Sequence, residues 1–513
     1  MVFPLSTSNS RRTFPTMTSL SIAKYNPGIT PKRCLRFMSP LGTVKGRAFA
    51  TTFLIVAVGL AQLASAQVFP GRPPDAPAAS PYALLPFEDD WSVVDELDVP
   101  TDDPARNIKA IDVGNNASLS LRTETRARVD VLDPGTFSDG VVSADTVSRV
   151  RAMASADLRV GNGFRTFVTL QYADTVGAKR PSLPIDVDRL DLQNAFVELS
   201  TPIGRNEFAL RVGRQELSFG STRMIAVRDS PNARLAFDGM RFDMKRGDGS
   251  VSAFVLQPAE DEIGTFDDGT DTDREFWGIY GTATSWLPAS TVETYYFALR
   301  ETEALFVAGA GPSERHTFGA RVSGATSAWD WDAEGAYQHG NFSGDGLSAW
   351  TIAAQFGHSW PDVAFSPRFG LTGSAISGDD GGTDRLETFD PPFPRGSYFD
   401  PAGLIGARNL LHLQPALGLS ISPSVSATLY ANAFWRESVD DGIYNGARQL
   451  VRGPGGSDER FVGTSWALGA DWRPDIHWKL ELELVHFEPG TFLRNTGSDD
   501  NGTFVQVELT HSF

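Results

Sequence analysis

Hydrophobic and polar residues alternate along much of this chain, and the C-terminal segment shows the pattern clearly. In segment 504–513, one parity carries two valines, a leucine and the terminal phenylalanine, whereas the other carries glutamine, glutamate, threonine and serine. A period of two describes a β-strand with one apolar and one polar face. An outer-membrane β-barrel closes on such a strand, because its wall has lipid outside and a polar lumen inside.

The same alternation recurs in segments of about ten residues, the length of a strand that crosses an outer membrane. In segment 117–131 the odd positions are mostly leucine, alanine and valine, and the even positions are mostly arginine, glutamate and aspartate. Segments 147–160, 424–436 and 476–487 repeat this arrangement. The pattern predicts a series of strands, each with one lipid-facing and one water-facing side.

Short and long connections alternate between these segments. The short ones, such as 161–163, 246–249 and 473–475, are rich in Gly, Pro, Asn and Asp, which favour tight turns. The long ones span 132–146, 173–189, 218–235, 258–274, 302–314, 340–346, 378–408, 437–459 and 488–502. This asymmetry predicts an all-β fold, a transmembrane antiparallel up-and-down barrel of about eighteen strands with short periplasmic turns and long extracellular loops.

Tryptophans flank the predicted short turns, and the set is Trp286, Trp360, Trp472 and Trp478. Aromatic residues at this level form the girdles of membrane barrels. Any one of these tryptophans could equally well lie at the end of a strand in the core of a soluble protein. The girdle is therefore inferred from the four residues together.

The N-terminal region has a different composition. A basic stretch at 45–47, an apolar run at 48–63 and the small residues Ala64-Ser65-Ala66 form a signal peptide with its cleavage site. We therefore expect residues 1–66 to be an extension plus a cleavable signal peptide, with Met38 as a candidate start. Residues 67–116 are rich in proline at their start and are predicted to be a periplasmic leader or a short plug. The barrel then spans 117–513.

Composition narrows the function classes. Only 41% of the 513 residues are hydrophobic, and the chain after the signal peptide has no run of about 18 apolar residues, which excludes a helical membrane protein. The one cysteine, Cys34, precedes the cleavage site, so the mature chain has no thiol for catalysis or metal binding. A net charge of −18 argues against nucleic-acid binding. The sequence lacks P-loop, HExxH and GxSxG motifs, so we do not expect an enzyme.

The positions that are predicted to face the lumen are rich in basic residues, with acidic residues between them. Arg214 has outward parity, and a bulge at Gly213 would turn it inward. The predicted pore-lining residues are Arg122, Arg126, Arg128, Arg149, Arg151, Arg159, Arg165, Arg211, Arg214, Arg241, Arg321, Lys479, Glu124, Asp157 and Glu198. The arginine fork suits the carboxylates of acidic saccharides. The alternative for any one of these arginines is a structural ion pair of the wall.

Acidic residues gather in the predicted loops. Asp267, Asp268, Asp271 and Asp273 are candidate calcium ligands, although their spacing matches no complete EF-hand loop. Solvated loops are the simpler interpretation, and divalent cations that bridge to lipopolysaccharide are a second one. No other cofactor is expected.

Four stretches, at 87–92, 119–126, 212–220 and 234–241, resemble the alginate export family of outer-membrane proteins. They include Phe87-Glu88-Asp89-Asp90-Trp91-Ser92 and Val212-Gly213-Arg214-Gln215-Glu216. The resemblance spans roughly 87–513. It implies an eighteen-stranded barrel that passes anionic polyuronate through an arginine-lined lumen.

The leading hypothesis is an outer-membrane, anion-selective channel that exports an alginate-like polysaccharide from the periplasm by passive diffusion. The alternatives are a porin of the same fold for uptake of small organic anions or oligosaccharides, and a structural or adhesive barrel. We expect a monomer in contact with outer-membrane lipid and lipopolysaccharide. Further expected partners are the barrel-assembly machinery, which would recognise Phe513, and periplasmic secretion components.

Overall fold

The structure is a computed structural model, and it describes residues 81–91, 99–133, 144–179 and 183–513. The predicted signal peptide, the candidate start and the cleavage site lie outside these residues. In the part of the chain that the structure describes, no helix has the length and apolar character needed to cross a membrane.

The wall is a closed antiparallel barrel of 18 strands, as predicted. The wall strands are β2 (Ala117–Asp133), β3 (Asp145–Val160), β4 (Phe164–Val176), β5 (Asp188–Ile203), β6 (Asn206–Glu216), β7 (Ala236–Arg246), β8 (Gly249–Glu260), β10 (Arg274–Leu287), β11 (Ser290–Phe306), β12 (Gly309–Ala325), β13 (Trp329–Phe342), β14 (Asp345–Ser359), β15 (Arg368–Ile376), β17 (Leu410–Ser422), β18 (Val425–Trp435), β21 (Phe461–Trp472), β22 (Trp478–Pro489) and β23 (Gly502–Ser512).

Smaller elements are not part of the wall. They are η1 (Pro86–Glu88), η3 (Pro104–Ile108), β1 (Ile111–Gly114), β9 (Gly269–Thr270), β16 (Arg385–Leu386), β19 (Ile443–Tyr444), β20 (Leu450–Arg452) and α2 (Thr491–Thr496).

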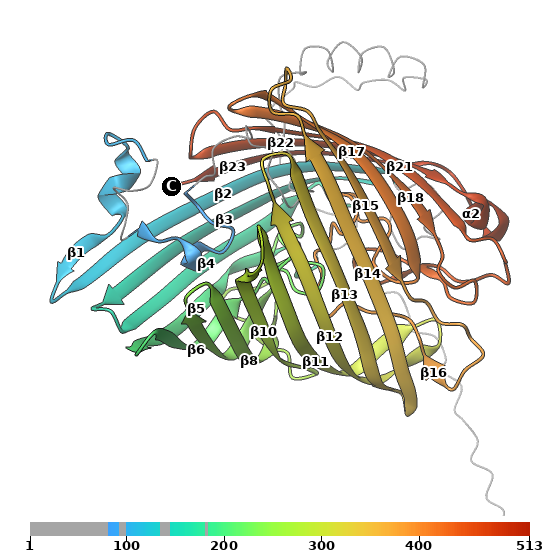
Figure 1. Cartoon of the computed structure of the whole chain (residues 1–513), viewed down its shortest axis with the longest axis horizontal. Coiled ribbons are helices and arrows are strands. Elements are labelled where there is room, and N and C mark those ends of the chain that lie inside the picture. The colour runs from blue at the N-terminus through green and yellow to red at the C-terminus, as the bar shows by residue number, and fades with distance from the viewer. Residues whose placement is uncertain (1–80, 92–98, 134–143, 180–182) are drawn as a thin grey trace, which may run out of the picture. The chain divides into compact units, whose positions relative to one another are not determined.

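The first and last wall strands close the ring, because β2 pairs with β23 in antiparallel register (Figure 1). This register places Arg128 directly opposite Glu508. The backbone of Phe513 also exchanges two hydrogen bonds with Thr123. The polar face of the C-terminal strand thus adjoins the arginine-rich face of the first strand.

Side-chain burial follows the predicted alternation. On β2, Arg122, Glu124 and Arg126 are buried toward the lumen, whereas Val129 and Val131 are exposed on the outer face. Large apolar side chains are likewise exposed on the outer face of other wall strands, as lipid contact requires. The four tryptophans of the predicted girdle are exposed beside short turns.

Two of the predicted long loops are wrong. β11 reaches Phe306 and β12 begins at Gly309, and β13 reaches Phe342 and β14 begins at Asp345, so both connections are tight hairpins instead of the loops 302–314 and 340–346. Ser343 and Gly344 have positive φ angles, which suit a two-residue hairpin. Phe306 and Phe342 pack together with the buried Leu347, which extends the strands at this end.

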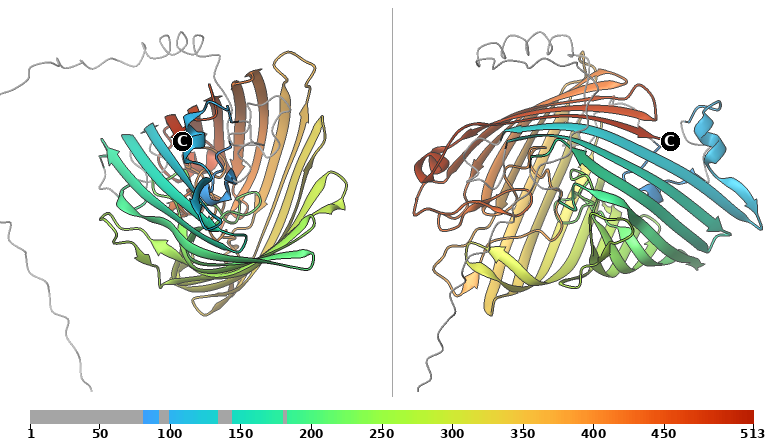
Figure 2. Two further views of the ribbon diagram at one scale, coloured as in Figure 1. Left: turned by 90° about the vertical axis from the view of Figure 1, so that its left-hand side faces the viewer. Right: turned by 180° about the vertical axis from the view of Figure 1, so that it is seen from behind.

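Loops 217–235 and 377–409 fold into the lumen (Figure 2). They meet at a parallel bridge between Ile225 and Phe393. Phe393 packs edge-on against Phe237 and Phe276 of the wall, with ring centroids 5.0 Å apart in each pair. These loops therefore carry a hydrophobic core inside the barrel, where an empty channel would hold water.

The N-terminal segment 81–91 contacts the inner wall at the short-turn end. Phe87 packs edge-on against Phe167 and Phe196, with centroids 5.9 and 5.5 Å away. Asp89 is buried and forms an ion pair of 3.0 Å with Arg122. Figure 2 shows the blue N-terminal elements at this end of the barrel.

Candidate functional site

A cavity of 680 Å³ remains between the inward-folded loops and the wall formed by β2, β3, β22 and β23. It extends to the short turns at Ser424 and Asp475, and on its other side it meets Tyr398 and Asp400 of loop 377–409. This volume lies in the range of about 300–1,000 Å³ that is usual for small-molecule sites.

Charged side chains dominate the cavity lining. Nine arginine and lysine side chains face seven carboxylates, so the cavity is net basic when all are ionised, although the whole chain carries −18. The basic residues are Arg122, Arg126, Arg128, Arg151, Arg228, Arg234, Arg395, Arg473 and Lys479. The acidic residues are Glu124, Asp229, Asp400, Asp475, Glu481, Glu483 and Glu508.

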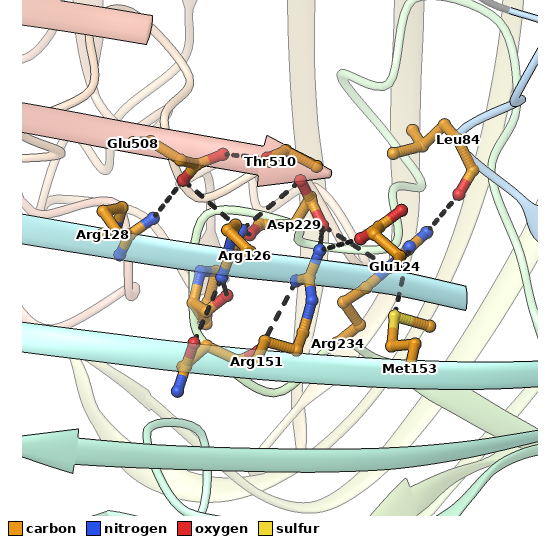
Figure 3. Close-up of polar contacts among 12 residues, drawn as sticks. Leu84, Glu124, Arg126, Arg128, Arg151, Met153, Asp229, Arg234, Glu508 and Thr510 are labelled. Atoms are coloured by element: carbon orange, nitrogen blue, oxygen red, sulfur yellow. Dashed lines mark hydrogen bonds and ion pairs between the residues drawn. The ribbon is translucent and has the colours of Figure 1, made fainter. Parts of the chain in front are cut away.

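Strand periodicity builds the basic wall. Arg126 and Arg128 are two residues apart on β2 and so share its inner face, and Arg151 on β3 lies directly opposite Arg126 (Figure 3). Glu124 accepts a hydrogen bond of 2.9 Å from Arg151 and another of 3.1 Å from Arg122. These contacts hold the guanidinium groups apart in fixed positions.

Asp229 of loop 217–235 enters this basic wall from the lumen side (Figure 3). Its carboxylate lies 2.8 Å from Arg151, 3.6 Å from Arg126 and 3.6 Å from Arg234. Burial alone would raise the pKa of Asp229, but Arg151, Arg126 and Arg234 outweigh it and hold the pKa well below its usual range. The Asp229 side chain is 32% exposed at the cavity, whereas its Oδ1 atom, which faces Arg151 and Arg234, is buried.

A buried ion pair fixes the C-terminal end of the loop. Arg234 lies 2.9 Å from Glu216, and both side chains are almost fully buried. Gln193 and Asn194 each donate a hydrogen bond to Glu216, and Arg234 donates one to the carbonyl of Leu84. The same arginine therefore links the loop, the wall and the N-terminal segment.

Arg228 differs from the other arginines of the lining. Among the described residues it forms no ion pair with a carboxylate, and its guanidinium carbon lies 5.7 Å from the centre of the Phe393 ring. Burial and the nearby Arg448 lower the pKa of Arg228 to about 10, so it stays protonated at neutral pH. It is thus a cation in the cavity lining that is available to a solute anion.

Carboxylates gather on the two wall strands that follow β2 around the ring on its other side, β23 and β22. Glu481 and Glu483 are on β22, and Glu508 is on β23. Lys479 pairs with Glu481 at 2.5 Å. Because β23 pairs with β2, these acids adjoin the arginines of the first strand, and Glu508 lies 3.7 Å from both Arg126 and Arg128.

The structure brings a subset of the predicted pore-lining residues to the cavity. They are Arg122, Glu124, Arg126, Arg128, Arg151 and Lys479. The other predicted residues lie along the wall away from this cavity and form ion pairs there. They are Arg149, Arg159, Arg165, Arg211, Arg214, Arg241, Arg321, Asp157 and Glu198.

Specific partners account for these wall residues. Arg159 and Arg165 share Asp157 at 3.0 and 2.7 Å, and Arg211 pairs with Glu198 at 2.6 Å. Arg149, Arg241 and Arg321 pair with Asp130, Asp243 and Asp332, respectively. These residues therefore fit the alternative interpretation, in which inward arginines form structural ion pairs of the wall.

The predicted bulge at Gly213 is wrong, because β6 pairs with β5 and β7 in continuous register through this position. Gly213 has a φ of +129°, and a Cβ there would lie 2.2 Å from the carbonyl oxygen of Ala195. The strand contains no extra residue at this point, and its backbone adopts a conformation that favours glycine. Arg214 then pairs with Asp238 at 2.9 Å.

Sequence reasoning missed the cavity residues that come from loops, namely Arg228, Asp229, Arg234 and Arg395. A signal was present in the first of these loops. Segment 217–235 contains three arginines and the apolar run Met224-Ile225-Ala226-Val227, which is unusual for a solvated extracellular loop. Such a composition indicates a loop that packs inside the protein.

The predicted calcium ligands do not come together as a set of four. Asp271 pairs with Arg274, and the backbone amide of Asp273 donates to Asp271. Asp268 instead meets Asp188 and Asp191 of β5. Burial raises the pKa of Asp268 to about 6.

A closed antiparallel barrel of 18 strands with apolar side chains on its outer face and a charged lumen is a transmembrane barrel of the bacterial outer membrane. The sequence profile of the alginate export family matches residues 118–506. The chain belongs to this family, as its motifs suggested, and is located in the bacterial outer membrane.

Solved porins share the fold at low sequence identity. OccAB3 of Acinetobacter baumannii is 10% identical, with a TM-score of 0.52, and the match covers 77% of this chain and 99% of that one. OpdK of Pseudomonas aeruginosa is 10% identical, with a TM-score of 0.51 and the same coverage. OccK2 (OpdF) of Pseudomonas aeruginosa, solved in complex with glucuronate, is 11% identical, with a TM-score of 0.50, and the match covers 77% and 98% of the two chains. No curated protein matches the chain.

Proposed function

We propose that this barrel is an anion-selective channel for saccharides that carry carboxylate groups, and that it passes polyuronate from the periplasm to the outside by passive diffusion. The observation that carries the proposal is the convergence of Arg126, Arg151 and Arg234 on one carboxylate, that of Asp229, at the edge of the cavity. A uronate carboxylate has the same charge and geometry as the aspartate side chain. The arginines that hold Asp229 are therefore suited to hold a uronate.

The acidic residues keep binding weak enough for transport. A solute anion that approaches Arg126 or Arg128 must compete with Glu508, which lies 3.7 Å from both guanidinium groups. Conduction requires a solute to leave each site as readily as it enters. Interleaved carboxylates meet this requirement, because no guanidinium of the β2 wall lacks an internal partner.

The position of the cavity supports entry from the periplasm. Its lining includes Ser424 and Asp475, which belong to short turns, and short turns face the periplasm in outer-membrane barrels. Loops 217–235 and 377–409 close the cavity on the other side. A saccharide from the periplasm would thus meet the arginines before it meets the loops.

The size of the cavity favours a second candidate, uptake or release of short acidic saccharides. A volume of 680 Å³ accommodates a small ligand, whereas a polymer must thread the whole lumen. Polymer export in our proposal therefore requires the N-terminal segment 81–91 and the inward loops to move aside. Glucuronate, the ligand in the OccK2 structure, is a suitable first probe for both candidates.

Single-channel recordings in planar bilayers distinguish these functions. Strong anion selectivity with current block by oligoguluronate or polymannuronate added on the periplasmic side supports polyuronate export. Selectivity with glucuronate permeation and no polymer block supports the porin candidate. A barrel that conducts no ions would contradict both and favour a structural or adhesive role.

Arg228→Ala is expected to reduce the anion-to-cation permeability ratio and to weaken glucuronate binding roughly three- to tenfold, which corresponds to about 0.7–1.4 kcal/mol. The reason is that Arg228 forms no ion pair with a carboxylate among the described residues, so its charge is available to the solute. Reversal potentials in a salt gradient measure the first effect, and glucuronate block of the current measures the second.

Arg300→Ala is the matched control for this prediction. Arg300 is also an arginine, but it is exposed outside the cavity and pairs with Glu275 and Glu314. Its removal should leave selectivity and glucuronate block unchanged. Equal effects of the two substitutions would show that the channel responds to net charge alone, against a specific role for Arg228.

A further inference from the structure

Carboxylates converge where loop 261–273 crosses the start of β5. Asp188 and Asp191 of β5 are 2% and 4% exposed, and the Asp268 side chain from the loop is 6% exposed. One carboxylate oxygen from each of the three lies within 4.8 Å of the other two. Asp261 and Asp267 of the same loop add negative charge close by.

Two buried oxygens in this cluster lack a hydrogen-bond donor. One is Oδ1 of Asp188, and the other is Oε1 of Gln171, a side chain that is 1% exposed. Gln171 lies opposite Asp191 in the β4–β5 ladder, and its Nε2 donates to Asp188 Oδ2 at 3.1 Å. An acceptor that is buried without a donor destabilises the fold, and a bound cation removes this cost because the oxygen then coordinates the ion.

The nearest basic side chain does not neutralise the cluster. Arg214 Nη1 lies 3.6 Å from Asp268, but the same guanidinium forms two bonds of 2.9 Å with Asp238. Asp188 and Asp191 have no basic partner among the described residues. Several buried carboxylates thus share less than one positive charge, which is unfavourable in the absence of a cation.

We propose that Asp188, Asp191, Asp268 and the amide oxygen of Gln171 bind one divalent cation, with Ca²⁺ as the best fit. All donors are oxygens, which hard cations prefer. Ca²⁺–oxygen distances of about 2.3–2.6 Å allow the ligands of one ion to lie up to roughly 5 Å apart, and the three carboxylate oxygens lie within 4.8 Å of one another. Mg²⁺ requires about 2.0–2.1 Å, and hence a tighter cluster.

The ion would attach the loop to the wall at the long-loop end of the barrel. The backbone already holds the two together, because Arg189 donates to the carbonyl of Gly264, Phe266 donates to that of Leu190, and Asp267 donates to the Asp191 carboxylate. A cation adds a strong contact at the same place. It would keep loop 261–273 folded against β5 whatever solute the channel carries, so the site is independent of the proposed function.

Titration of the purified, chelator-treated full barrel with CaCl₂ in a calorimeter tests the site. We expect one ion per chain with a Kd of about 10⁻⁴–10⁻³ M, the range of extracellular calcium sites. Asp188→Asn together with Asp191→Asn should weaken binding at least tenfold. The matched control, Asp271→Asn with Asp273→Asn, removes the same charge from the other end of loop 261–273 and should bind as the unmodified chain does.

Hydrogen exchange of residues 262–268 gives a second readout, since Ca²⁺ should slow exchange there in the unmodified chain and in the control. Asp268→Asn changes only the loop, so it tests the site even if the double variant fails to assemble. The proposal is overturned by the absence of both heat and protection at about 10 mM Ca²⁺, ten times the weakest expected Kd. Equal binding by the Asp268→Asn variant and the unmodified chain would overturn it as well.

Discussion

Asp229→Ala is expected to increase the affinity of the channel for glucuronate at least tenfold and to raise its anion selectivity. Asp229 is the internal carboxylate on which Arg126, Arg151 and Arg234 converge. Removing one partner of a buried charge pair costs about 2–5 kcal/mol, much of it from the charge left unpaired. A uronate that binds in place of Asp229 recovers part of this energy, and each 1.4 kcal/mol recovered is a tenfold gain in affinity.

Current block by glucuronate and reversal potentials measure the two effects. Asp229→Glu keeps the charge and should resemble the unmodified channel. Asp362→Ala removes one carboxylate from an exposed short turn outside the cavity, and so controls for net charge. If Asp229→Ala leaves both quantities at the level of Asp362→Ala, the three arginines do not form an anion site that a solute can occupy.

The pH dependence provides a separate check on Asp229. Its pKa in the folded chain is held below the value in the unfolded chain, so its contribution to stability is complete above the unfolded pKa of about 3.9. The contribution is lost only as the pH falls further, toward the folded pKa. Anchoring of loop 217–235 through Asp229 should therefore persist at pH 4.

Replacing Phe87 and Asp89 together by alanine is expected to release the N-terminal segment and to raise single-channel conductance severalfold. Phe87 loses its contacts with Phe167 and Phe196, and truncation of a buried phenylalanine costs about 3–5 kcal/mol. Asp89→Ala breaks a buried ion pair with Arg122, which costs a similar amount. The docking equilibrium should shift by at least a hundredfold, since each 1.4 kcal/mol is a factor of ten.

Glu88→Ala is the matched control, because Glu88 lies between the two residues but is exposed. Conductance in planar bilayers and hydrogen exchange of residues 81–91 should change together in the double variant and stay constant in the control. Rapid exchange of the segment with unchanged conductance would show that it docks without obstructing the lumen.

The alternation of side chains made the barrel predictable. Successive side chains of a β-strand point to opposite faces, so the sequence of β2 alone assigns Arg122 and Arg126 to the lumen and Val129 to lipid. The placement of Glu508 beside the first strand was also predictable, because an up-and-down barrel must close its last strand on its first. Loop lengths were less predictable, since Phe306 and Phe342 extend the strands by packing against each other.

The sequence by itself determined the strands, their faces and their neighbours, because these depend on local alternation and on hairpin connections. Only the tertiary structure decided which inward arginines meet the cavity and which are paired along the wall. That choice depends on loops 217–235 and 377–409, which bring Arg228, Asp229 and Arg395 into the lumen from far along the chain. The charge that a solute meets is therefore set by long-range packing of loops inside the barrel, for which the strand pattern contains no signal.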